Sequence, residues 1–290
     1  MTTSSAITPT AASGTLAIGG DLPVNRLGYG SMHLAGPGAW GPGRDRDEAL
    51  RVLRRAVELG VTFIDTADVY GPFVTDELIR TALHPYPEDL VIGSKVGSSN
   101  QGPGKWAPIG RPEYLRQQTL LNLRHLGLDR IDLLQLHRID PQVPLADQIG
   151  ELRAMQDEGL VRHVGLSEVT VAEIEAAAAI TPIVSVQNRF NLADRASEDV
   201  LDYCTAQGIA FIPWFPLAYG KLAGPRSPLT AIAEKHRCTP SQLALAWLLH
   251  RAPTILPIPG TSSVAHLEQN IAAATFDLTD DEFERLNALS

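Results

Sequence analysis

Short apolar segments alternate with longer amphipathic segments along almost the entire chain, and this alternation constrains the fold more than any other feature. The short segments predict β-strands at residues 27–30, 62–65, 90–94, 131–137, 163–167, 183–187, 210–214 and 255–258. The longer segments predict helices at residues 47–59, 75–83, 112–126, 145–158, 171–179, 194–207, 240–250 and 264–274. Eight repeats of a strand followed by a helix favour a closed (β/α)8 TIM barrel over an open, doubly wound sheet.

Both ends of the chain extend beyond this pattern. Residues 1–14 are rich in Ser, Thr and Ala and predict a flexible N-terminal tail, while residues 15–290 predict a single barrel domain. A Gly-Gly pair at the centre of residues 15–24 predicts a β-hairpin before the first barrel strand. Residues 279–288 begin with Thr-Asp-Asp-Glu, a capping box that predicts an extra C-terminal helix.

Charge and hydropathy restrict the classes of partner. The formal net charge of −9 argues against a nucleic acid or an anionic membrane surface as the main partner. No run approaches the ~18–20 apolar residues of a membrane span, and the N-terminus lacks the pattern of a signal peptide. We therefore expect a cytoplasmic protein that acts on a small molecule, with no protein partner implied. No spacing of Cys and His residues predicts a metal site.

Three polar residues stand where predicted strands end. Asp65, Lys95 and His137 fall at the C-terminal ends of the second, third and fourth strands. Neighbouring strands lie about 4.8 Å apart, so these side chains can converge at the face where barrel enzymes carry their active sites. Tyr70 follows on the next loop and can fold back over the same point. Each residue alone has an ordinary structural explanation, but apolar strands normally exclude such a combination.

The combination suits proton transfer. A free Tyr hydroxyl has a pKa near ~10, too high for an efficient acid at neutral pH, and a nearby Lys lowers that pKa by stabilising the phenolate. Asp65 would keep Lys95 charged and oriented. His137 would hydrogen-bond a carbonyl oxygen and position it for protonation.

At these positions the chain resembles the aldo-keto reductase superfamily. The similar segments are GVTFIDTADVYG (60–71), VIGSKVG (91–97) and LLQLHRID (133–140), and the resemblance extends from about residue 15 to the C-terminus. It implies an NADPH-dependent reductase of aldehydes or ketones. Tyr70 would then be the proton donor and His137 would orient the substrate. Asp65 and Lys95 would form the pair that tunes Tyr70.

The same resemblance implies a set of cofactor contacts. The implied residues are Gly30, Ser31, Met32, Asp65, Ser167, Gln187, Trp214, Pro216, Leu217, Gly260, Thr261, Ser262, His266, Gln269 and Asn270. Among them, Ser167 and Gln187 would bind the nicotinamide carboxamide, and Trp214 would stack on the nicotinamide ring. Glu168 stands where the family usually carries Asn, and its role is left open.

The segment PIPGTSSVAHLEQN (257–270) corresponds to the family's site for the 2′-phosphate of NADPH. A helix N-terminus with hydroxyl side chains is suited to an anion. Many family members carry Lys or Arg here, whereas this chain resembles the branch with potassium-channel β-subunits and aflatoxin-aldehyde reductases, which use NADPH. We expect NADPH, with NADH open as a second cofactor. Arg226 is a weaker candidate phosphate ligand, because a solvated loop charge is its more ordinary explanation.

The substrate pocket is assigned to loops. Residues 29–50 resemble the bacterial branch that includes pyridoxal reductases, which makes pyridoxal a candidate substrate. Residues 97–110 are rich in Gly, Pro and Ser, lie on the active-site side and are expected to cover the substrate. The candidate pocket residues are His33, Trp40, Phe73 and Trp106.

Two alternative functions stay open at the level of the sequence. Lys95 could form a Schiff base with a carbonyl substrate, as the lysines of barrel aldolases do. The chain could also be a nucleotide-binding regulatory subunit with slow turnover, like the channel β-subunits.

Overall fold

The computed structural model describes residues 8–217 and 229–288. Its helices are α1 (Arg46–Glu58), α2 (Val74–Leu83), α3 (Pro112–Leu126), α4 (Leu145–Asp157), α5 (Val171–Ala178), α6 (Glu198–Gln207), α7 (Leu229–His236), α8 (Pro240–Arg251), α9 (Val264–Ala272) and α10 (Asp280–Asn287). Its strands are β1 (Thr15–Ile18), β2 (Leu22–Asn25), β3 (Tyr29–Gly30), β4 (Phe63–Asp65), β5 (Val91–Val96), β6 (Ser98–Asn100), β7 (Trp106–Pro108), β8 (Ile131–Leu136), β9 (Val161–Ser167), β10 (Ile183–Gln187) and β11 (Ala210–Phe211).

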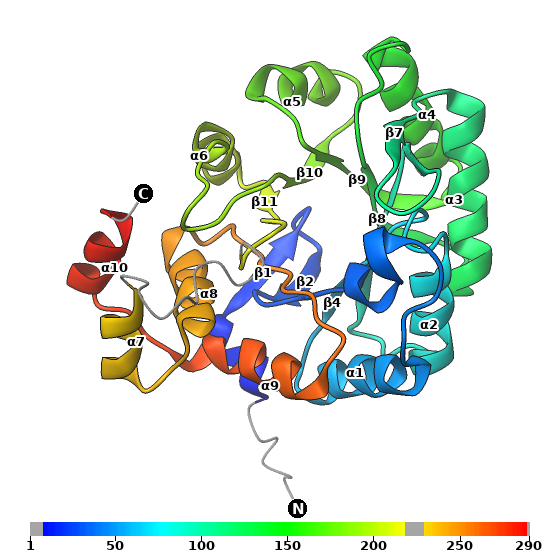
Figure 1. The fold of residues 1–290 in the computed structure, drawn as a ribbon. Coiled ribbons are helices and arrows are strands. Elements are labelled where there is room, and N and C mark those ends of the chain that lie inside the picture. The colour runs from blue at the N-terminus through cyan, green and yellow to red at the C-terminus, as the bar shows by residue number, and fades with distance from the viewer. Residues whose placement is uncertain (1–7, 218–228, 289–290) are drawn as a thin grey trace, which may run out of the picture.

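Seven parallel strands form one curled sheet in the order β11-β10-β9-β8-β5-β4-β3, with the large helices outside it (Figure 1). Residues 255–260 run between the two edge strands and close the ring. Ile255 bridges Phe211 of β11, and Gly260 bridges Gly30 of β3, both in parallel. The sheet and this closing segment form a (β/α)8 barrel, which confirms the predicted architecture.

The closing segment is less regular than predicted. The sequence predicts an eighth strand at residues 255–258, but the structure shows only isolated contacts there. The Leu256 N–H donates to the Phe211 carbonyl oxygen, and the Gly28 N–H donates to the Pro257 carbonyl oxygen, each at 2.9 Å. Pro257 and Pro259 have no N–H group, so the segment cannot sustain a continuous ladder of hydrogen bonds.

A two-stranded hairpin covers one end of the barrel. β1 and β2 pair antiparallel, and the turn between them uses Gly19 and Gly20, both with positive φ. The hairpin buries the side chains of Ile18, Leu22 and Val24. They pack in one cluster with apolar residues at the start of the barrel strands, among them Phe63, Val91 and Ala210. Because this packing fills the N-terminal end of the barrel, the carboxyl ends of the strands form the open face.

Several local expectations need correction. Pro9–Ser13 form a short 3-10 helix, η1, and buried Thr10 bonds the carbonyl of Leu59 through its amide and its hydroxyl, so these residues belong to the fold rather than to a tail. Helix α6 begins at Glu198 rather than 194, because Asp194 pairs with Asn191 in a turn.

Two elements escaped prediction. Helix α7 was missed, although Leu229, Ile232 and Ala233 give it an apolar face at helical spacing. Strands β6 and β7 form an antiparallel hairpin inside the predicted loop 97–110. In the described part of the chain, no helix is both long enough and apolar enough to cross a membrane.

Candidate active site

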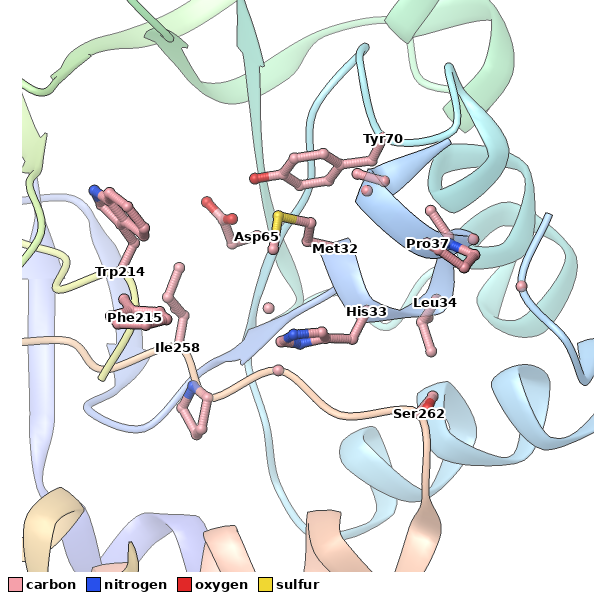
Figure 2. Close-up of a pocket in the computed structure, with 18 of the residues that line it drawn as sticks. Met32, His33, Leu34, Pro37, Asp65, Tyr70, Trp214, Phe215, Ile258 and Ser262 are labelled. Atoms are coloured by element: carbon pink, nitrogen blue, oxygen red, sulfur yellow. The ribbon is translucent and has the colours of Figure 1, made fainter. Parts of the chain in front are cut away.

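A cavity of about 1150 Å3 opens at the carboxyl ends of the barrel strands. It brings together side chains from the ends of β4, β9 and β10 and from the loops that follow them, and Figure 2 shows Asp65, Tyr70 and Trp214 around the same space. The predicted residues that line it are Gly30, Met32, His33, Asp65, Tyr70, Trp106, His137, Ser167, Gln187, Trp214, Pro216, Leu217, Gly260 and Ser262.

Tyr70, Lys95 and Asp65 form a connected buried group. The Nζ atom of Lys95 donates hydrogen bonds to Asp65 Oδ1 at 2.6 Å and to the Tyr70 hydroxyl oxygen at 3.2 Å. Lys95 is fully buried and lies beneath the cavity surface rather than in its lining. Burial alone would lower the pKa of Lys95, but Asp65 and Tyr70 outweigh this effect and raise it. Lys95 is therefore a cation at neutral pH.

Two further contacts hold this group in place. Lys95 Nζ also donates to the carbonyl oxygen of Thr66 at 2.9 Å, and the side-chain amide of Gln187 donates to Asp65 Oδ2 at 2.8 Å. Both carboxylate oxygens of Asp65 are thus engaged, one by the ammonium and one by an amide. Three groups besides the two charges, the Thr66 carbonyl, the Tyr70 hydroxyl and the Gln187 amide, thus satisfy the buried pair, as such a pair requires.

The net effect on the pKa of Tyr70 differs from the expectation. Burial is the largest influence and raises the pKa of Tyr70 above its ordinary value, while the charge of Lys95 and its hydrogen bond lower it only in part. Tyr70 is therefore a neutral phenol at neutral pH. Because Lys95 can only donate, the Tyr70 oxygen accepts that bond and keeps its own hydrogen for another acceptor.

His137 faces Tyr70 at the end of the cavity formed by Asp65, Lys95 and Tyr70, called here the catalytic end because the proposed catalytic residues gather there. The two ring centroids lie 6.2 Å apart, and the Trp106 ring lies 5.7 Å from His137 and 6.2 Å from Tyr70, all in edge-on geometry. Burial, followed by the charges of Lys95 and Arg138, lowers the pKa of His137 well below its ordinary value. His137 is therefore a neutral imidazole that can donate one hydrogen bond. The β6–β7 hairpin places Trp106 over these residues, as expected of a covering loop.

Glu168 anchors the predicted stacking residue. Its Oε1 atom accepts from the indole Nε1 of Trp214 at 2.5 Å and from the backbone N–H of Arg189 at 2.7 Å. Glu168 itself has a φ of 58°, which turns the chain sharply after β9. The residue that replaces the usual Asn thus fixes the orientation of an aromatic ring in the cavity wall.

The predicted phosphate site is only partly assembled around the cavity. Ser262 lines it, but Thr261 and Asn270 are buried, and His266 and Gln269 lie exposed on α9 outside the lining. The N-terminal N–H of α9, at Val264, donates to the Glu48 carboxylate of α1 at 3.0 Å. A carboxylate of the chain itself therefore occupies part of this helix terminus.

Three other predicted residues do not line the cavity. Ser31 is fully buried. Trp40 is 40% exposed and does not line the cavity, although its backbone bridges Gly71. Phe73 has a φ of 58° at the start of α2 and stacks its ring on His125 of α3, with centroids 4.5 Å apart. Arg226 lies outside the described residues.

Sequence reasoning missed several lining residues. Arg138 and Phe215 directly follow the predicted residues His137 and Trp214, and that adjacency could have indicated them. Residues 34–39 and 43–45 also contribute to the wall. Among the described residues, no group of three or more His, Cys, Asp or Glu side chains is arranged to hold a metal ion.

Comparisons with known proteins agree with this geometry. Residues 26–290 match the aldo/keto reductase family. The chain is 51% identical over 268 residues to an uncharacterized oxidoreductase of Schizosaccharomyces pombe, covering 92% of this chain and 87% of that protein. It is 46% identical over 277 residues to pyridoxine 4-dehydrogenase of Escherichia coli, covering 93% and 96%. An aldo-keto reductase from Klebsiella pneumoniae in complex with NADPH is similar with a TM-score of 0.82 at 25% identity, covering 95% and 94%. The chain therefore belongs to the aldo/keto reductase family of oxidoreductases.

Proposed function

We propose that the protein reduces an aldehyde or ketone with NADPH and that Tyr70 donates the proton to the carbonyl oxygen. The observation that carries this proposal is the bond from Lys95 to the Tyr70 oxygen, which leaves the phenolic hydrogen free at the cavity. After the proton has left Tyr70 Oη, the phenolate is stabilised by the same ammonium group. His137, as a neutral donor, would hold the carbonyl oxygen near Tyr70.

The residues of the cavity suit a nicotinamide cofactor. The hydroxyl of Ser167 and the amide oxygen of Gln187 stand at neighbouring strand ends and could bind a carboxamide, and Trp214 and Phe215 supply aromatic surface. Gly30 and Gly260 lack side chains, which lets the two backbone segments approach each other closely in the cavity wall. A Cβ atom on Gly30 would lie only 2.7 Å from the carbonyl oxygen of Ile258. The chemistry that a bound NADPH would supply is hydride donation. These residues would orient the ring and exclude water.

Steady-state kinetics test this function. A panel of aldehydes and ketones is mixed with the protein and NADPH, and cofactor oxidation is followed by absorbance. We expect multiple turnovers with several small aldehydes and no requirement for an added metal. Binding of NADPH without turnover of any carbonyl would contradict the proposal and favour the regulatory-subunit alternative.

Pyridoxal is the proposed substrate within this class. Its support is the similarity to a pyridoxine 4-dehydrogenase, together with the aromatic surface that Trp106 places beside Tyr70 and His137. The test compares pyridoxal with 4-nitrobenzaldehyde under the same conditions. If 4-nitrobenzaldehyde is reduced and pyridoxal is not, the pyridoxal proposal fails while the general reductase function stands.

The geometry disfavours the aldolase alternative. A Schiff base requires an unprotonated, accessible amine, whereas Lys95 is fully buried, paired with Asp65 and held as a cation. Borohydride trapping in the presence of a carbonyl substrate should therefore leave Lys95 unlabelled.

A further inference from the structure

Arg138 places a guanidinium group in the wall of the cavity, directly after His137 at the end of β8. Its Nη1 atom donates to the carbonyl oxygen of His137 at 2.5 Å and to the Ser167 hydroxyl oxygen at 3.1 Å. These contacts hold one edge of the guanidinium against the strand ends. A guanidinium carries five N–H groups, so the Nε and Nη2 donors are not used by these bonds.

The charge of Arg138 is not neutralised by a salt bridge within the described parts of the chain, unlike that of Arg189, which pairs with Asp194 at 2.8 Å. Glu168 is the carboxylate whose charge acts on Arg138 through space. The Oε1 atom of Glu168, however, is already engaged by Trp214 and by the backbone of Arg189.

Among the described residues at this end of the cavity, Arg138 is the cation whose charge is not offset by a neighbouring carboxylate. Lys95 is paired with Asp65 beneath the surface, and His137 is neutral. Arg44 and Asp45 also line the cavity, but they bring opposite charges on adjacent residues. A partly desolvated guanidinium binds carboxylate and phosphate oxygens more strongly than an exposed one, because water screens it less.

We infer that Arg138 binds an anionic group of the substrate, so that the enzyme prefers aldehydes or ketones that carry a carboxylate or a phosphate to neutral ones, and reduces pyridoxal 5′-phosphate more efficiently than pyridoxal. This inference rests on the proposed reductase function. Such a substrate would place its carbonyl between Tyr70 and His137 and its anion on the neighbouring guanidinium. The aromatic wall at Trp106 would contact the part of the substrate between these two groups.

The test uses the holoenzyme with saturating NADPH and two aldehydes of the same shape, 4-formylbenzoate and its neutral methyl ester. For the unmodified enzyme we expect kcat/KM for the acid to exceed that for the ester by about tenfold or more. Arg138→Met should remove this preference and change kcat/KM for the ester less than about threefold, while Arg138→Lys should keep part of it. Pyridoxal 5′-phosphate and pyridoxal form a second pair, which shows whether phosphate or carboxylate is the favoured anion.

The Ser167→Ala variant tests whether Arg138 acts by binding the substrate anion or only by holding Ser167 at the cofactor site. This variant loses the Arg138 contact with Ser167 but keeps the guanidinium and its bond to the His137 carbonyl, so it should weaken NADPH binding and change the acid-to-ester ratio much less than Arg138→Met does. Binding of benzoate to the NADP+ complex, followed by tryptophan fluorescence, gives a readout without turnover. Arg138→Met should weaken that binding by about tenfold.

Three results would overturn the inference: an acid-to-ester ratio near one in the unmodified enzyme, an equal loss for both aldehydes in Arg138→Met, or the same change of ratio in Ser167→Ala. A protein that binds NADPH but reduces neither aldehyde would instead contradict the proposed function and remove the basis for this inference.

Discussion

The two ends of the same cavity are built differently. At the catalytic end, Asp65, Lys95 and Tyr70 are almost fully buried and joined by hydrogen bonds of 2.6 and 3.2 Å. At the rim near α9, Ser262 is exposed, and the first N–H of the helix binds Glu48, which lies 216 residues away in the chain. The catalytic end is thus a closed polar network, whereas the rim is an exposed surface that a side chain from another helix completes.

This difference separates two properties of the enzyme. Groups in the buried network depend on one another, so a change to one residue alters both chemistry and stability. Groups at the rim are solvated and only weakly coupled, so a change there should alter the choice of cofactor with little effect on the fold.

Lys95→Met should destabilise the protein most. It leaves the Asp65 carboxylate buried without its cation, a loss that costs about 3–5 kcal/mol of unfolding free energy. Ser262→Ala at the rim is the control and should change that free energy by less than about 0.5 kcal/mol. Urea unfolding measures both. Equal stability losses in the two variants would remove the distinction between the two ends.

Tyr70→Phe should abolish most of the activity and lower stability less than Lys95→Met does, because it removes one hydrogen bond but leaves no buried charge unpaired. The ring and its packing stay, but the proton donor is lost, so carbonyl reduction should fall by about a hundredfold or more. NADPH binding, measured by titration, should change little. A variant that retains near-normal turnover would show that Tyr70 is not the acid.

Glu168→Ala should loosen the Trp214 ring. We expect NADPH affinity to fall by about five- to tenfold and the quenching of tryptophan fluorescence by NADPH to decrease, because the indole loses its hydrogen-bond acceptor. Glu168→Gln keeps an oxygen at this position and should retain most of the NADPH affinity and most of the fluorescence quenching.

Trp214→Ala should remove the part of the tryptophan fluorescence that NADPH quenches, whereas Trp40→Phe, which changes an exposed ring outside the cavity, should preserve it. Quenching that is unchanged in Trp214→Ala would refute the stacking role.

Glu48→Gln should increase the discrimination between the two cofactors. The unmodified enzyme should prefer NADPH to NADH only modestly, because no Lys or Arg stands in residues 257–270 and a carboxylate occupies the α9 terminus. Removing that charge should raise the preference for NADPH over NADH by several fold, which corresponds to about 1 kcal/mol. Asp47→Asn makes the same charge change one residue away and should have a smaller effect. An identical response of NADPH and NADH kinetics to Glu48→Gln would contradict a phosphate site at this position.

The smallest effect concerns pH. Because burial lowers the pKa of His137 well below its ordinary value near ~6.5, its imidazole should stay neutral as the pH falls from 8 to 6. With NADPH saturating, kcat should therefore change less than about twofold over this range. A proportional loss of kcat below pH 6.5 that disappears in His137→Gln would show that His137 titrates normally.

The sequence predicts the catalytic end well because strand ends are local features. An apolar run fixes where a strand ends, and parallel pairing brings the ends of neighbouring strands together, so Asp65, Lys95 and His137 needed no knowledge of distant contacts. Ser167 and Gln187, which the family resemblance implied, also line the cavity. Predictions for loops and helix faces were less accurate. Phe73 and Trp40 are aromatic residues near the active site in sequence, but local backbone conformation turns Phe73 onto α3, and Trp40 is exposed outside the cavity.

Hydrophobic periodicity and short motifs were enough to predict the barrel, most of its strands and helices, and the convergence of Asp65, Lys95 and His137 at one face. Which charges act on the cavity became visible only in the folded structure. The contact of Glu48 on α1 with the N-terminus of α9, the anchoring of Trp214 by Glu168 and the bond from Arg138 to Ser167 all join segments that are distant in the chain. Electrostatic interactions follow distance and burial in space, and neither quantity is encoded by the spacing of residues along the chain.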